Sequence, residues 1–312
     1  MIGLAQVYLF AGLVFAAFAV LSLRDASNPK RLANAGFWGL LALSMLAGDR
    51  LGDFGNGLLV LALVAIAGLG GLGRGQGSTS AEDRAVAAQR HGNRLFLLAL
   101  VIPAVALAGT LLFKYLPALV DGKQATLVSL ALGVLIALAL GMAVLRTTPV
   151  VAMQEGRRLV DAVGWAGILP QMLASLGAVF ALAGVGNVVG SMMAGVIPQG
   201  SLLAAVIAYG LGMALFTMAM GNAFAAFPVI AAAIGLPVLI HQYHGDPAIV
   251  AAIGMLAGFC GTLMTPMAAN FNMVPAALLE LRDRNAVVKA QVGTALPLLA
   301  INIALIYFLA FP

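Results

Sequence analysis

Two polar runs interrupt the apolar second half of this sequence, and each contains residues that could bind a small ligand or an ion. The first run begins with Gly221 and Asn222 at the end of an apolar stretch, and Pro228 follows six residues later. Proline removes a backbone donor and disfavours helix at the preceding residue, so the chain is predicted to open between residues 221 and 228. Unpaired backbone groups at membrane depth are tolerated only where they are buried in protein or line a cavity.

The second run, residues 261–272, places uncharged hydrogen-bonding side chains among prolines and glycines. Asn270 and Asn272 would point in different directions on a continuous helix, whereas they would share a face in unwound backbone. Amide side chains in an apolar segment are costly unless they have partners. Polar contacts that bend or join helices are the alternative interpretation. We predict a substrate or ion site formed by Gly221, Asn222, Thr262, Thr265, Asn270 and Asn272.

The composition identifies the elements that must position these residues as membrane helices. Hydrophobic residues make up 62% of the chain, charged residues only 9%, and the mean hydropathy is +1.06. Soluble domains carry about 25% charged residues. We therefore predict an all-α polytopic membrane protein, with two or more spans broken or re-entrant. The ten predicted spans lie near residues 2–23, 33–48, 54–72, 95–117, 125–145, 165–186, 201–220, 221–241, 248–276 and 291–311.

The basic residues predict the orientation of these spans. When the loops are numbered alternately, one side receives 13 of the 16 Lys and Arg residues, and the other receives only Arg50, Lys114 and Lys123. Basic loops lie on the cytoplasmic side, so both termini are predicted to be extracytoplasmic. Because topology accounts for the net charge of +5, nothing in the charge indicates a nucleic-acid partner.

The chain divides into five predicted segments: residues 1–72, a cytoplasmic linker at 73–94, a two-helix segment at 95–145, a basic loop at 146–164 and a transport core at 165–312. A short surface helix is predicted to begin near Ser80 in the linker. For the basic loop we favour an orientation-setting role, with an amphipathic helix as the alternative. Gly-Asn steps at residues 186–187 and 221–222 are compatible with inverted repeats or with ordinary turns. Glycines near residue 190 favour close helix packing.

No spacing in the chain is typical of a catalytic or metal site, so we predict neither an enzyme nor a resident cofactor or metal. Between Arg158 and Arg282 there is no Lys or Arg, so an anionic substrate would have to meet helix N-termini, backbone N–H groups, a cation or a partner subunit. The only acid between Asp161 and Glu280 is Asp246, in a predicted solvated turn. Coupling to Na⁺ is therefore favoured over coupling to protons.

The C-terminal third resembles a bacterial membrane-protein family that is associated with 5-oxoproline (pyroglutamate) uptake. The resemblance is carried by the segments 220–230, 244–247, 254–258, 261–272 and 275–280, and it is specific from about residue 215 onward. Upstream of that point only hydropathy and length match.

This resemblance implies a secondary carrier without ATPase parts, which works with a smaller membrane subunit in the bacterial inner membrane. It also implies that Asn222, Thr262, Thr265, Asn270 and Asn272 line the substrate site, where amide groups suit the lactam of 5-oxoproline. A carrier for another small organic anion or amino-acid derivative is the second interpretation. A non-transporting accessory subunit is the third. The sequence leaves a higher oligomer open.

Overall fold

The computed structural model describes residues 2–69, 71–75, 77–116, 118–195, 197–198, 200–279 and 281–311. These residues form helices and turns, together with an isolated bridge between Ile2 and Val120. The chain divides into two compact units, Met1–Trp165 and Ala166–Pro312.

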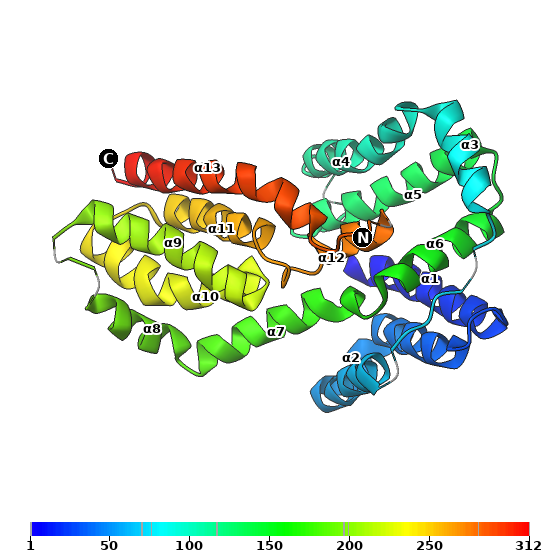
Figure 1. Cartoon of the computed structure of the whole chain (residues 1–312), viewed down its shortest axis with the longest axis horizontal. Coiled ribbons are helices and arrows are strands. Elements are labelled where there is room, and N and C mark those ends of the chain that lie inside the picture. The colour runs from blue at the N-terminus through cyan, green and yellow to red at the C-terminus, as the bar shows by residue number, and fades with distance from the viewer. Residues whose placement is uncertain are drawn as a thin grey trace. The chain divides into compact units, whose positions relative to one another are not determined.

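The first unit is organised around two pairs of apolar helices. Helix α1 (Leu4–Arg24) packs along α2 (Arg31–Leu69), and α4 (Arg94–Phe113) pairs with α5 (Ala125–Leu145). These helices run from blue to green in Figure 1. Both α4 and α5 are apolar around their whole circumference, as expected for helices that face lipid or other helices rather than water.

Small residues allow α4 and α5 to approach closely. A β-carbon on Gly133 would lie 2.8 Å from the carbonyl oxygen of Ile102, and one on Gly109 would collide with the side chain of Ser129. Close backbone approach at small residues is a common basis of helix association in membranes, where apolar burial adds little.

Helix α2 contains the predicted span 33–48 and residues 54–69 of the predicted span 54–72. Gly52 interrupts it with a positive φ of 62°, a conformation that glycine adopts without steric cost. The two stretches on either side of Gly52 therefore have separate helix axes.

Two amphipathic helices complete the first unit. Helix α3 (Ala81–His91) begins at Ser80, whose hydroxyl accepts from the Asp83 N–H while the Asp83 carboxylate accepts from the Ser80 N–H. This capping box confirms the helix predicted to begin near Ser80. Residues 146–164, for which we favoured a basic loop, instead form α6 (Pro149–Val163), the alternative interpretation. Thr148 caps α6, and one face of the helix packs against α1.

The second unit begins within the short 3₁₀ turn η1 (Gly164–Ile168). Its first two helices, α7 (Leu169–Leu182) and α8 (Val185–Ala194), bend by 67° relative to each other at the positive-φ residue Gly184. The elements that follow are α9 (Leu202–Met220), α10 (Ala223–Ile230), the π-helix η2 (Ala231–Gln242), α11 (Pro247–Leu263), α12 (Met273–Leu278) and α13 (Ala286–Leu309).

Helix α9 forms the centre of this second unit and contacts α10, η2, α11 and α13. Tyr209 of α9 is fully buried, and its hydroxyl donates to the Val250 carbonyl of α11 across 3.2 Å. Gly254 leaves room for the Tyr209 ring, since a β-carbon there would overlap it. The site residues described below lie at the ends of α9 and α11.

Seven helices in the described residues are long and apolar enough to cross a membrane, or eight if the bent pair α7 and α8 forms one span. The predicted spans 2–23, 125–145 and 201–220 correspond closely to α1, α5 and α9. Helix α11, with 17 residues, is shorter than the predicted span 248–276, and α12 follows it after a non-helical stretch. The count of ten crossings stays a prediction.

Candidate functional site

The first polar run is a two-residue interruption between α9 and α10. Gly221 ends α9 with a left-handed φ of 76°, and Asn222 is extended. The Asn222 side-chain oxygen accepts from the Phe224 N–H at 2.7 Å, so this residue caps α10. The chain was predicted to remain open as far as Pro228, which is wrong: the helix resumes at Ala223, and Pro228 lies within it.

The second polar run forms a series of turns between α11 and α12. Backbone bonds such as Ala269 N–H to the Met267 carbonyl, at 2.9 Å, close the turns one after another. Thr262 lies in the last turn of α11, and its hydroxyl donates to the Phe259 carbonyl at 2.6 Å. This part of the chain is neither extended nor continuous helix.

The two runs meet directly. The Thr265 hydroxyl donates to the Met218 carbonyl at 2.9 Å, which ties the turns after α11 to the last turn of α9. A β-carbon on Gly221 would lie only 2.5 Å from the Met267 carbonyl oxygen. The structure therefore brings Gly221 and the neighbouring Asn222 into one region with Thr265.

Asn272 holds the second run together from inside. Its amide nitrogen donates to the carbonyls of Thr262 and Thr265, at 2.8 and 2.6 Å. Its side chain is fully buried, and its oxygen Oδ1 has no hydrogen-bond partner among the described residues. A buried acceptor without a partner is costly, so it indicates a place where a donor or a cation would be stabilised.

Asn270 differs from Asn272 although it lies only two residues away. Asn270 is partly exposed, whereas Asn272 is buried. The turns separate the two amides, so only Asn272 is fixed in the interior of this unit.

The structure adds two buried polar residues that sequence reasoning missed. The Thr217 hydroxyl of α9 is buried without a partner among the described residues, and it faces Gly258 of α11. Asn302 of α13 donates to the Cys260 sulfur at 3.5 Å. Both are single polar residues within otherwise apolar helices, a weak signal in sequence. Among the described residues of this unit, the buried polar Asn and Thr side chains are Thr217, Asn222, Thr262, Thr265, Asn272 and Asn302.

Aromatic rings join the two runs on another side. The ring of Phe224 in α10 packs edge-on against Phe259 of α11, with centroids 5.7 Å apart. Phe259 also contacts Phe271 in the second run, with centroids 6.3 Å apart. Phe224 and Phe271 are exposed, so this row of rings presents an aromatic surface beside the polar region.

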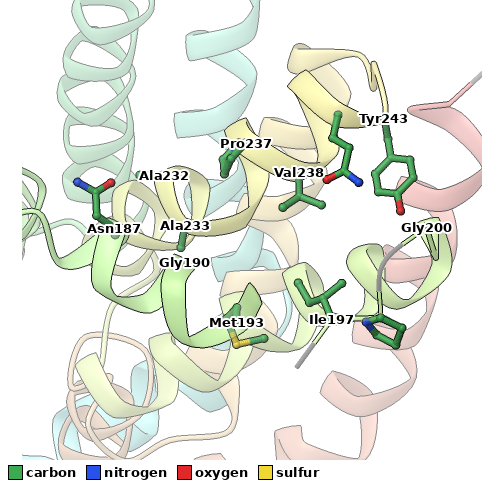
Figure 2. A pocket seen from close by; sticks show the side chains of 13 residues that line it. Asn187, Gly190, Met193, Ile197, Gly200, Ala232, Ala233, Pro237, Val238 and Tyr243 are labelled. Atoms are coloured by element: carbon green, nitrogen blue, oxygen red, sulfur yellow. The ribbon is translucent and has the colours of Figure 1, made fainter. Parts of the chain in front are cut away.

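A cavity of about 690 Å³ lies between α8 and η2, the π-helix that continues from α10. Figure 2 shows Asn187 on one side of it and Tyr243 on the other, with Pro237 and Val238 between them. None of the six predicted site residues lines this cavity. The π-helix is rare, and the single-turn π-bulges that make up most examples are frequent at functional sites.

The glycines of α8 serve the packing role that their spacing predicts. A β-carbon on Gly186 would lie 2.8 Å from the Ala232 β-carbon, and one on Gly190 would lie 3.0 Å from the Ala233 carbonyl oxygen. Both positions allow α8 to lie close to η2.

The turn that precedes α11 carries His244 and Asp246. Asp246 is exposed and accepts from the N–H groups of Ala248 and Ile249, so it caps α11. Within the described ranges, no three His, Cys, Asp or Glu side chains are grouped so that they could hold a metal.

The long apolar helices and the buried neutral polar cluster define an all-helical, membrane-embedded protein. This chain belongs to the family described as "Protein of unknown function (DUF979)", whose model matches residues 5–311. Neither a curated protein nor a solved structure matched the chain.

Proposed function

We propose that this protein is a membrane subunit of a secondary active transporter for 5-oxoproline. The observation that carries the proposal is the meeting of two non-helical chain segments at Gly221, Thr265 and Met267 within an apolar helical unit. Transporters commonly place substrate and ion sites where helices are interrupted near the middle of the membrane. In this proposal the chain crosses the membrane about ten times, and two or more of its spans are broken.

The neutral groups of this region suit a lactam. Asn222 uses its side-chain oxygen to cap α10, which leaves its amide N–H groups as donors for the lactam carbonyl. Asn272 uses its amide nitrogen for two backbone carbonyls, which leaves Oδ1 as an acceptor for the lactam N–H or as a ligand for a cation. Thr262 and Asn270 complete the predicted lining.

The substrate carboxylate needs a positive partner that this part of the chain does not supply, since there is no Lys or Arg between Arg158 and Arg282. A co-transported Na⁺ meets that need, and oxygen atoms are the ligands that such hard cations prefer. Thr217 Oγ1 and Asn272 Oδ1 are buried oxygens without partners in the described chain, so we propose them as Na⁺ ligands. This favours Na⁺ over proton coupling at the site.

The second source of positive charge is a partner. We propose that a smaller membrane subunit associates with this chain in the bacterial inner membrane and contributes a cationic side chain. An alternative is that the carrier accepts another small organic anion or amino-acid derivative, since the neutral lining suits amides in general. An accessory subunit that does not transport would use the same contacts for packing only.

Uptake of radiolabelled 5-oxoproline into proteoliposomes tests the proposal. The full chain is reconstituted alone and with its partner, under an imposed Na⁺ gradient or an imposed proton gradient. We expect uptake that requires the partner and the Na⁺ gradient. Competition by unlabelled organic anions separates the two carrier interpretations, because the preferred substrate gives the lowest half-inhibiting concentration.

Two substitutions test the site itself. Asn222→Ala and Asn270→Ala should lower the transport rate or raise the half-saturating substrate concentration, whereas Asn285→Ala, at an exposed position before α13, serves as the matched control. If both site variants insert stably and transport like the control, the carrier interpretation fails. Lower expression with unchanged specific uptake would instead support the accessory subunit.

A further inference from the structure

A buried ionic cluster joins three separate segments of the first unit. Nη1 of Arg157 in α6 lies 2.7 Å from Asp25 Oδ2 and 3.2 Å from Asp161 Oδ2. The side chains of Arg157 and Asp161 are 5% and 1% exposed, and that of Asp25, just after α1, is 11% exposed. Two carboxylates therefore share one guanidinium in a region largely closed to water.

Two neutral donors complete the surroundings of Asp161. The Trp38 indole N–H and the Asn34 amide both donate to Asp161 Oδ1 at 2.8 Å. Trp38 is held by its neighbours, since Phe15 stacks on its ring at 5.9 Å and Phe37 packs edge-on at 5.0 Å. The Asp161 carboxyl group therefore occupies a rigid pocket.

The two carboxyl groups of the cluster differ in their protonation. Burial raises the pKa of Asp161 above its usual value, and the donors and Arg157 only partly offset this effect, while the nearby charge of Asp25 adds to it. For Asp25, burial acts in the same direction, but hydrogen bonds from Ser27 and Arg157 outweigh it and lower the pKa. An added proton therefore goes to Asp161 rather than to Asp25.

A glycine-rich segment, residues 71–75, packs against this cluster, and we call it the glycine strap. Asn34 binds it in two ways: Gly73 N–H donates to Asn34 Oδ1, and the Asn34 amide donates to the Gly73 carbonyl, both at 2.8 Å. Gly75 lies directly against the Asp25 carboxylate and Arg157, where any β-carbon would collide. The same Asn34 amide contacts both the strap and Asp161.

Water can reach the edge of the cluster. A cavity of about 350 Å³ is lined by Arg24, Asp25, Arg157 and Gln154, together with Gly77 and Ser78, which follow the glycine strap in the chain. When the strap lifts, this cavity would widen toward Asp161, and hydration would restore the carboxyl group to its ordinary acidity.

We propose that Asp161 is a proton-binding site, and that its protonated form keeps the glycine strap seated. Deprotonation leaves a buried carboxylate that is stabilised when water enters, so it favours lifting of the strap. The charged groups near Asp161 are Arg157 and Asp25 in contact, Arg74, which donates to the adjacent Ala162 carbonyl at 3.5 Å, and Lys30, which lies beside Gly71 and Gly73.

The difference in Asp161 pKa between the seated and lifted states of the strap fixes the direction in which pH changes the fraction of lifted strap. The seated state has the higher Asp161 pKa, so it binds the proton more tightly than the lifted state. The fraction of lifted strap therefore rises as pH increases from the ordinary aspartate pKa to the raised pKa, by up to about tenfold per pH unit, and then levels off. Protection of the strap amides against hydrogen exchange is therefore greatest at the acidic end of this pH range.

Hydrogen–deuterium exchange of the backbone amides of residues 71–75 tests this proposal in the full chain embedded in lipid nanodiscs. Exchange rates are corrected for the intrinsic pH dependence of amide exchange, and they are measured from about pH 4 to about pH 8. We expect corrected exchange to rise with pH in the native protein. Asp161→Asn, which is neutral at every pH, should stay protected and pH-independent. A purely structural role of the carboxylate predicts the opposite, a loss of protection in Asp161→Asn.

Two further variants shift the response without removing Asp161. Asp25→Asn removes a nearby negative charge, so the rise should end at lower pH. Trp38→Phe keeps an aromatic side chain but removes the indole N–H that donates to the ionised carboxylate, so the rise should extend to higher pH. Asp283→Asn, which breaks an exposed ion pair with Lys289, is the control and should change nothing.

A flat response in the native protein, or the native response persisting in Asp161→Asn, overturns the proposal. If Asp161→Asn does not fold, the opposite shifts of the other two variants decide.

Discussion

The hydroxyl of Thr265 donates to the Met218 carbonyl across 2.9 Å, and this bond joins the turns after α11 to the last turn of α9. The carbonyls in the last turn of a helix have no partner within the helix, so they are available to such side chains. The same hydroxyl accepts from the Met267 N–H at 3.2 Å. One side chain thus satisfies backbone groups on both chain segments at the proposed transport site.

Replacing Thr265 by valine should therefore damage the site without changing its volume. Thr265→Val leaves the Met218 carbonyl unpaired in an apolar region, which costs about 1–3 kcal/mol, and it frees the two segments to move apart. We expect uptake to fall by about tenfold or more, measured as the initial rate in proteoliposomes with matched protein content. Thr265→Ser keeps the hydroxyl and should retain most of the activity. Equal loss in both variants would show that the hydroxyl is not the cause.

Gly221 is predicted to tolerate no side chain. Its φ of 76° disfavours other residues, and a β-carbon would lie 2.5 Å from the Met267 carbonyl oxygen. Gly221→Ala should lower the free energy of unfolding by about 2–4 kcal/mol, from backbone strain and overpacking together. The midpoint of thermal unfolding in detergent measures the loss. Gly293→Ala is the matched control in α13, where a β-carbon meets open space, and it should be neutral or slightly stabilising.

Much of the helical framework could be predicted from sequence because long apolar stretches have few other solutions in a membrane. The interruption at Gly221 and Asn222 was predictable because these residues follow an apolar run of helical length, whereas the Gly-Asn step at residues 186–187 lies inside α8. The effect of Pro228 was overestimated, since the chain accommodates it within α10 and continues as the π-helix η2. Proline in membrane helices is tolerated where neighbouring groups adjust to the missing bond.

The residues that could not be predicted depend on long-range contacts. Asp161 lies in a stretch for which the sequence favoured a basic surface loop, and its partners Asn34 and Trp38 lie more than 120 positions away in the chain. Nothing in the local pattern distinguishes it from a solvated acid. Thr217 is a single hydroxyl on an apolar helix, and only the packing of Gly258 against it shows where it points.

Acid should weaken the segment that follows the glycine strap, residues 77–80, through Glu155. This carboxylate accepts from the Thr79 N–H at 2.9 Å and from Arg158 Nε at 2.7 Å. Burial tends to raise its pKa, but the hydrogen bonds from Arg158 and Thr79 outweigh burial and lower the pKa to about 2. A lowered folded-state pKa contributes stability above the unfolded value, here 4.5, and loses it as pH falls toward 2.

We therefore expect the native protein to lose about 1 kcal/mol of stability between pH 6 and pH 3 through this group, because the pKa shift alone corresponds to about 2 kcal/mol over this interval and partial solvent screening reduces it. Thermal unfolding of the full chain at the two pH values measures the change. Glu155→Gln keeps an acceptor but cannot titrate, so it should lose less stability than the native protein over the same interval. An equal loss in Glu155→Gln would assign the acid sensitivity to other carboxylates.

The charge bias and the length of α11 together make a prediction about topology. Helix α11 has 17 residues, which span about 26 Å, slightly less than the roughly 30 Å hydrocarbon core. If the turns at residues 264–272 complete the crossing, then Gln242 and Arg284 lie on opposite sides of the membrane. Single cysteines at these two exposed positions, introduced with Cys260→Ala, test this with a membrane-impermeant maleimide.

We expect Gln242→Cys to react in intact cells and Arg284→Cys to react only after permeabilisation, because basic loops stay cytoplasmic. Labelling of both in intact cells would make α11 and the turns a re-entrant segment, and the reverse pattern would invert the proposed orientation.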